Sequence, residues 1–147
     1  MDYKGYTIWQ PEQDELANFY GSGLYSNFET LNNNEYLIIE DENGEPIDYY
    51  LKHKENLEKV KYPILDSEFG GRIMPRNAQQ FCAMDLVKRK DIPIKLITGR
   101  FGSGKSLCMI AGALEALQKG HFEKIVFVRN NVQVKDTESI GALPGLN

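Results

Sequence analysis

Cysteine and histidine are scarce in this chain of 147 residues, which contains two of each. Cys82 and Cys108 fall in apolar, helix-like segments, and no set of cysteines and histidines has the spacing of metal ligands. We therefore expect both thiols to be buried side chains in a reducing compartment, rather than disulfide partners or zinc ligands. Neither a disulfide scaffold nor a zinc domain fits this sequence.

Long hydrophobic runs are also missing from the sequence. No apolar stretch is long enough to cross a bilayer, and the polar residues at the start do not resemble a signal peptide. These two absences predict a cytoplasmic protein that has no membrane partner. The length itself suits about one domain with a sizeable core.

Positive charge is scarce in the first half of the chain. Residues 1–71 carry five lysines and fifteen acidic residues, a balance of −10, whereas residues 72–147 have a balance of +6. The formal net charge of −4 therefore hides two surfaces of opposite sign. The basic part suits phosphate ligands or RNA, although an ordinary solvated face remains the alternative for its scattered charges.

The acidic part predicts a small, mostly β module over residues 1–71. Residues 11–20 are typical of a helix, with a proline at the first position and acids in the first turn. Two apolar runs surround an Asn-Gly turn within residues 35–51, the pattern of a β-hairpin. Residues 60–65 favour an additional edge strand, and the Gly70-Gly71 pair marks a plausible boundary.

The second half contains a glycine-rich phosphate-binding pattern. Residues 99–106 read Gly-Arg-Phe-Gly-Ser-Gly-Lys-Ser and satisfy G-x-x-x-x-G-K-[ST] at every required position. The apolar residues 94–98 predict a short buried strand before this loop, and residues 106–117 predict a helix after it. Strand, glycine loop and helix form the context in which the pattern binds phosphate.

The residue types explain how such a loop holds a nucleotide. Gly102 and Gly104 have no Cβ, so the backbone can wrap closely around an anion with its N–H groups pointing inward. We expect Lys105, the candidate catalytic residue, to reach the β- and γ-phosphates and Ser106 to ligate Mg²⁺. The predicted nucleotide-contacting residues of this segment are Gly99, Arg100, Phe101, Gly102, Ser103, Gly104, Lys105, Ser106 and Leu107. For Arg100 and Phe101, which occupy unconstrained positions, an ordinary loop role is the alternative.

The elements around the loop set the expected fold class, α/β. A helix capped by Asn77 should run to Lys90, and residues 124–129 predict a second buried strand. Residues 94–129 then form one βαβ unit with two parallel strands. We expect a P-loop NTPase-like partial parallel sheet, in the order strand, P-loop, helix, strand, preceded by the small β module.

Four motifs in this order resemble the PhoH-like P-loop ATPases. They are Pro75–Gln80, Leu96–Ser106, Ile125–Val132 and Gly141–Gly145, and together they lie within residues 72–147. The resemblance is to the bacterial branch that usually carries an N-terminal PIN ribonuclease domain. It identifies residues 72–147 as the N-terminal part of a PhoH-like ATPase domain.

This resemblance implies roles for two more residues and several ligands. Gln80 stands where the family places a glutamine whose amide reads the adenine edge, with a helix-surface glutamine as the alternative. Arg129 matches the Thr-Arg-Pro position of the family, although Asn130 replaces the proline, and implies a phosphate or RNA contact. ATP and Mg²⁺ are the implied ligands, RNA is the implied substrate, and a ring-shaped homo-oligomer is the implied assembly.

Two family features are absent from the printed sequence. Residues 1–71 are too few for a PIN domain, and Asp136 and Glu138 lie in a polar segment unlike a Walker B strand. We therefore expect a truncated ATPase domain that binds Mg-ATP with little hydrolysis and is completed by another chain. The alternative is a non-enzymatic interaction module, or a split-protein fragment, with a vestigial P-loop. A GTPase or nucleotide kinase is disfavoured because no Asn-Lys-x-Asp motif is present.

Overall fold

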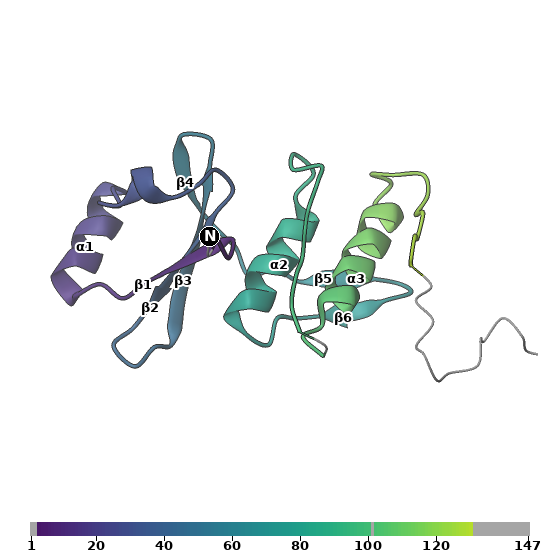
Figure 1. Cartoon of the computed structure of the whole chain (residues 1–147), viewed down its shortest axis with the longest axis horizontal. Coiled ribbons are helices and arrows are strands. Elements are labelled where there is room, and N and C mark those ends of the chain that lie inside the picture. The colour runs from purple at the N-terminus through teal and green to yellow at the C-terminus, as the bar shows by residue number, and fades with distance from the viewer. Residues whose placement is uncertain (1–2, 101, 131–147) are drawn as a thin grey trace, which may run out of the picture.

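The computed structural model describes residues 3–100 and 102–130. Its strands are β1 (Tyr6–Trp9), β2 (Tyr36–Glu40), β3 (Pro46–His53), β4 (Asn56–Lys59), β5 (Leu65–Ser67) and β6 (Gly71–Ile73). Its helices are α1 (Gln13–Ser22), α2 (Ala78–Lys88) and α3 (Lys105–Gln118), with a 3₁₀ turn, η1, at Phe28–Thr30. Figure 1 shows the layers in a row: α1, the sheet of β1 to β4, α2, and then α3 with the small β5–β6 sheet.

The four-stranded sheet near the N-terminus, called the front sheet below, has the strand order β1-β2-β3-β4. Strands β2 and β3 form the antiparallel hairpin predicted for residues 35–51, and Gly44 has φ +79° in its turn. A side chain is strained at such an angle, which explains the glycine. The sequence did not predict β1, which pairs in parallel with β2 from Tyr6 opposite Tyr36 to Trp9 opposite Ile39.

Strand β2 is central because both of its faces are buried. Leu37 and Ile39 pack with Phe19 of α1 on one face. Tyr36 and Ile38 pack on the opposite face with Phe81 of α2. Successive strand residues point to opposite faces, so the uninterrupted apolar run in β2 is what a strand between two helical layers requires.

Helix α1 confirms the helix predicted at residues 11–20, displaced toward the C-terminus. Glu12 caps it, accepting a hydrogen bond from the backbone at the third helical position, while the Glu15 carboxylate accepts one from the Glu12 N–H at 3.2 Å. This reciprocal pair satisfies two donors at the helix start. Gly23 ends the helix at φ +72°, with its N–H bonded to the Phe19 carbonyl.

Helix α2 connects the sheet to the glycine loop. The Asn77 side chain accepts a hydrogen bond from the Gln80 N–H at 2.9 Å, which confirms the predicted cap. On the sheet side, the Tyr36 hydroxyl donates to Asp85 at 2.6 Å, and Arg89 Nε donates to the same carboxylate oxygen at 2.7 Å. Burial, and then the Asp85 charge, raise the pKa of Tyr36, so its hydroxyl stays protonated and remains the donor.

The strand predicted at residues 60–65 is wrong in its bounds. The structure has β4 before this segment and β5 from Leu65, with no strand between them. Strand β5 pairs antiparallel with β6, and Gly70 and Gly71 lie at the turn, where Gly71 has φ +69°. The glycine pair therefore marks a hairpin turn, and the division into units at 1–71 and 72–147 stays a prediction.

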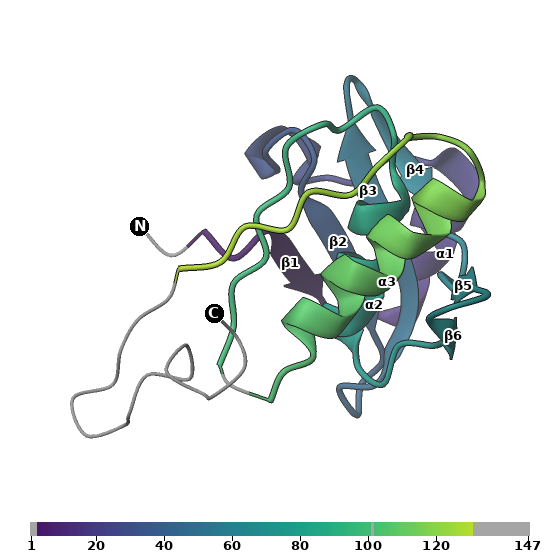
Figure 2. The ribbon, with the colours of Figure 1, turned by 90° about the vertical axis from the view of Figure 1, so that its right-hand side faces the viewer.

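Helix α3 confirms the helix predicted after the glycine loop and packs closely on α2. A Cβ added at Gly112 would stand 2.7 Å from Val87 Cγ2, so only glycine permits this approach. Leu65, Met84 and Cys108 form the core between β5 and the two helices. Glu115 is buried there and accepts a hydrogen bond from the Asp66 N–H at 2.7 Å, which ties β5 to α3. Figure 2 shows α3 nearest the viewer with α2 behind it, and the sheet of β1 to β4 behind both helices.

The two strands predicted on either side of the loop and helix are wrong. The described residues 94–98 and 124–129 have no strand assignment, and most of their apolar side chains face solvent, with Leu96 83% and Val128 85% exposed. An apolar run favours burial but forms a strand only where a neighbouring backbone accepts its hydrogen bonds. The protein is a mixed α/β structure whose described parallel pair is β1–β2 in the front sheet.

Candidate functional site: a glycine loop beside a cavity

The glycine loop leads directly into α3. Gly104 occupies the N-cap position at φ +81°, and Gly102 has φ +78°. Both angles lie in the left-handed region that L side chains rarely adopt. The Ser103 N–H donates to the Arg100 carbonyl at 3.3 Å, which closes the turn between them. The pattern of glycines therefore matches the backbone that the loop adopts.

The loop is packed tightly against α2 and against itself. A Cβ at Gly104 would stand 3.2 Å from Gln80 Nε2, and a Cβ at Gly99 would stand 2.8 Å from the Ser103 hydroxyl. Close packing fixes the loop at the start of α3. Gly104 has no side chain that could cap the first turn of α3. The N–H groups of that turn point toward the N-terminal end of the helix, where the loop lies. Such a helix start attracts anions.

Lys105 is the first residue of α3, and its side chain turns back over the loop. The ammonium donates hydrogen bonds to the carbonyls of Gly99 and Arg100. The positive charge is therefore held at the glycine loop rather than extended into solvent. Ser106 follows in the first turn and is exposed, as a residue that contacts a bound metal ion needs to be.

Gln80 joins α2 to the loop through both ends of its amide. Its carbonyl oxygen accepts from the Arg76 N–H at 2.9 Å, and its NH₂ group donates to the Ser103 carbonyl at 3.1 Å. A primary amide has two donors and room for two bonds at its oxygen. One donor and one acceptor position therefore remain for a ligand.

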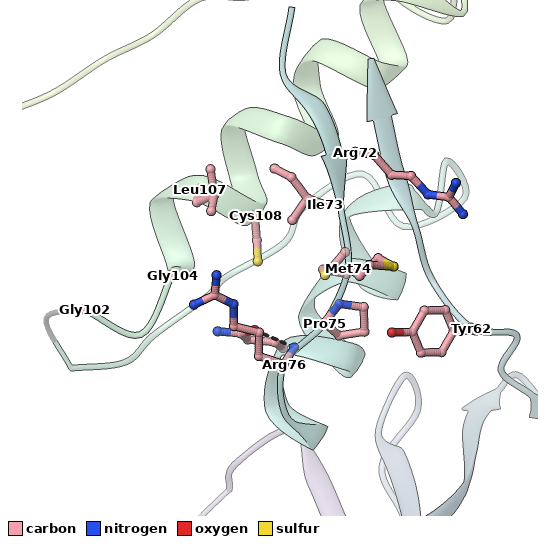
Figure 3. A pocket seen from close by; sticks show the side chains of 12 residues that line it. Tyr62, Arg72, Ile73, Met74, Pro75, Arg76, Gly102, Gly104, Leu107 and Cys108 are labelled. Atoms are coloured by element: carbon pink, nitrogen blue, oxygen red, sulfur yellow. Dashed lines mark hydrogen bonds between the residues drawn. The ribbon is translucent and has the colours of Figure 1, made fainter. Parts of the chain in front are cut away.

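A cavity of about 590 Å³ lies beside this loop. Its size falls within the range typical of sites for small molecules and cofactors. It is lined by Tyr62, Arg72, Ile73, Met74, Pro75, Arg76, Gln80, Met84, Gly102, Gly104, Leu107 and Cys108. Figure 3 shows the two glycines at one end of the cavity and Tyr62 at the other. Within the described part of the chain, this lining contains two arginines and no acidic residue, so it favours a negatively charged ligand.

Cys108 lines the cavity but is a poor nucleophile. Cys108 is 4% exposed, and burial raises the pKa of its thiol. Cys82 lies in the core between α2 and the sheet, where burial and the nearby Asp85 raise its pKa to about 12. Both thiols are free and buried, which confirms their predicted structural role.

Comparison with known proteins identifies the family to which the sequence belongs. The family model described as PhoH-like protein matches residues 72–147, the part that contains α2, the glycine loop and α3. The chain belongs to the PhoH-like family. It is 30% identical over 148 residues to Protein PhoH2 of Bacillus subtilis strain 168, in an alignment that covers 97% of the chain. No solved structure matches the chain significantly.

The PhoH-like match extends over only part of the relative. This chain spans 33% of the length of the Bacillus protein. The alignment nevertheless includes most of the acidic front module, which lies outside residues 72–147. The residues that form the sheet of β1 to β4 are therefore part of the aligned sequence.

The structure brings several predicted site residues of this PhoH-like protein together. Gln80, Gly102, Gly104 and Leu107 line the same cavity, and Leu107 is 55% exposed. Arg129 is exposed and does not belong to the described lining. Phe101, Asp136 and Glu138 lie outside the described residues, as do Val132 and the motif at 141–145.

Several lining residues were not among the predicted contacts. Pro75 and Arg76 lie in the first PhoH-like motif, so their neighbourhood was visible in the sequence. Tyr62 gave no such signal, because it lies in the front module and reaches the cavity only through the packing of that module on α2. Arg72 and Met74 come from β6 and the residue that follows it.

Over residues 3–100 and 102–130, no three histidine, cysteine, aspartate or glutamate side chains are grouped to hold a metal ion. Mg²⁺ takes oxygen ligands in proteins, so the Ser106 hydroxyl in the first turn after the glycine loop has the chemistry to hold this ion. None of the described helices combines the length and apolar character needed to cross a membrane.

Proposed function

We propose that this protein binds ATP together with Mg²⁺ through residues 99–106. One observation carries the proposal: the glycine loop opens α3 with left-handed Gly102 and Gly104 beside a cavity whose described lining is basic. Backbone N–H groups and the start of α3 cradle the phosphates. The family match supports nucleotide binding in general, and ATP is the proposed nucleotide.

Individual residues have distinct roles in this proposal. Lys105 bonds the β- and γ-phosphates, and Ser106 holds the metal ion. The ion neutralises charge that the phosphates carry. Gln80 contacts adenine through its side-chain amide. The bonds to Arg76 and Ser103 use one donor and one acceptor position of this amide, and the second donor and second acceptor position bind the base. Arg129 contacts phosphate or RNA only if the segment that bears it moves to the site.

We further propose binding without appreciable turnover by this stretch alone. Phosphoryl transfer depends on placed charges and on an oriented attacking water. Among the described residues, no carboxylate lines the cavity to perform that orientation. Work on RNA and assembly into a homo-oligomer, both implied by the family, belong to the whole protein.

A second candidate function is a docking module with a vestigial loop. It is favoured by the apolar side chains that the second half exposes, such as Ile94 at 88% and Val126 at 72%. Exposed apolar patches of this kind mark surfaces that other polypeptide covers. The partner is then a completing chain or a second copy.

Titration of a fluorescent ATP analogue, with and without Mg²⁺, tests the first candidate. We expect saturable binding that Mg²⁺ strengthens and that unlabelled ATP displaces better than GTP. Circular dichroism on the same sample establishes that the chain is folded. If a folded chain binds no nucleotide, the proposal fails and the docking module takes its place. Equal displacement by GTP would remove the role given to Gln80.

A further inference from the structure

Tyr62 is an exposed aromatic residue that packing holds in place. It lies between β4 and β5, and 57% of it is exposed. Its ring meets Phe81 edge-on, with centroids 5.7 Å apart and an interplanar angle of 79°. Phe81 is itself stacked on Tyr49 at 3.6 Å. This aromatic series anchors the Tyr62 ring to the core, while the residue stays exposed and lines the cavity.

The position of Tyr62 within the cavity is as informative as its exposure. Figure 3 places Tyr62 at the end opposite Gly102 and Gly104, with Met74 and Pro75 between them. The cavity thus has a polar end at the loop, where phosphates are proposed to lie. On the Tyr62 side the cavity offers a ring, a thioether and a proline, with the Arg72 side chain nearby, and a flat group can lie against these surfaces.

We propose that this far end receives the nucleobase and that Tyr62 is the ring on which the base stacks. The inference rests on the proposed function, because it needs the phosphates of the same ligand at the glycine loop. Stacking on an aromatic ring suits any base, since every base has a π-face. Tyr62 therefore adds affinity for the base without distinguishing one base from another.

Isothermal titration with two ligands separates the base from the phosphates. Mg-ATP carries a base, and inorganic tripolyphosphate with Mg²⁺ carries the phosphates alone. The variants are Tyr62→Ala, Tyr62→Leu, which keeps apolar volume without a ring, and Tyr62→Phe, which keeps the ring. Phe69→Ala is the matched control, because Phe69 is 86% exposed and does not belong to the described lining.

We expect Tyr62→Ala and Tyr62→Leu to weaken Mg-ATP binding about tenfold, the effect of losing one base–aromatic stack. Tripolyphosphate binding should not change, and Tyr62→Phe and Phe69→Ala should match the wild type with both ligands. Unchanged ATP affinity in both ring-less variants overturns the inference. Equal weakening for ATP and tripolyphosphate also overturns it, since Tyr62 then only supports the fold.

Two further results separate this inference from the proposed function. If the wild type binds ATP no more tightly than tripolyphosphate, the loop binds phosphate but the far end of the cavity does not bind the base. If the wild type binds neither ligand, the proposed function fails and the inference fails with it. Thermal unfolding of each variant, followed by circular dichroism, verifies that only folded proteins are compared.

Discussion

Lys105→Ala is expected to weaken Mg-ATP binding about 100-fold, the largest functional effect of a single substitution in this protein. The Lys105 ammonium lies over the glycine loop, bonded to the Gly99 and Arg100 carbonyls, so its charge already stands at the proposed phosphate site. Charge-assisted bonds to phosphate are among the strong ones, and alanine removes them while leaving the backbone donors of the loop. Equilibrium titration of wild type and variant measures the change.

Lys124→Ala is the matched control for this prediction. It removes the same charge from an exposed residue beyond α3. If nonspecific attraction between a basic surface and an anion explained binding, both alanine variants would weaken it by a similar, modest factor, and added salt would abolish the difference. Nucleotide affinity that survives Lys105→Ala at the wild-type level contradicts the site.

Asp85→Ala is expected to cost about 2 to 4 kcal/mol of unfolding free energy, the largest stability effect among the polar residues considered. Asp85 accepts hydrogen bonds from the buried Tyr36 hydroxyl and from Arg89, whose guanidinium also meets Glu58 at 3.2 Å. The Asp85 and Arg89 side chains are only 15% and 17% exposed. Alanine leaves a buried hydroxyl and a half-buried cation without their shared acceptor. Urea denaturation followed by tryptophan fluorescence measures the loss.

A tyrosine–aspartate pair in which the tyrosine is exposed provides the control for this network. The Tyr20 hydroxyl donates to Asp48, in the same chemistry as the Tyr36–Asp85 bond, but Tyr20 is 49% exposed. Tyr36→Phe should lower the unfolding free energy by about 1 to 2 kcal/mol and Tyr20→Phe by less than about 0.5. Equal effects of the two phenylalanine variants would show that burial does not strengthen the network that joins the sheet to α2.

Short-range chemistry explains which elements the sequence predicted. The loop glycines, the Asn77 cap and the β2–β3 turn each depend on backbone angles or hydrogen bonds within a few residues. Such signals can be read locally, because only glycine tolerates positions such as Gly44 and Gly104 without strain. The helix after the loop follows from the same local pattern.

Long-range pairing explains what the sequence did not predict. Strand β1 pairs with β2, whose residues follow it by about thirty positions, and no turn between them fixes a register. Residues 94–98 and 124–129 have strand-like apolar patterns, yet in the described chain no neighbouring strand accepts them. An apolar composition indicates that a segment is expected to be buried, but it does not identify the strand or helix that buries it.

The same division applies to the candidate site. The glycine-loop end of the cavity could be predicted, because residues 99–106 are contiguous. The far end could not, because Tyr62 joins residues such as Met74 only after α2 packs on the front sheet through Phe81. Gln80 was predicted as a ligand contact, and its bonds to Arg76 and Ser103 became visible only in the folded protein.

Amide chemical-shift mapping reports directly on whether nucleotide binds at the glycine loop. Mg-ATP is titrated into the ¹⁵N-labelled chain, and every assigned backbone N–H is followed. If the loop cradles phosphates, the largest shifts arise at Gly102, Gly104 and Lys105, with smaller ones along the cavity at Met74 and Arg76. Shifts that are absent, or that are confined to the acidic front sheet, contradict nucleotide binding at the glycine loop.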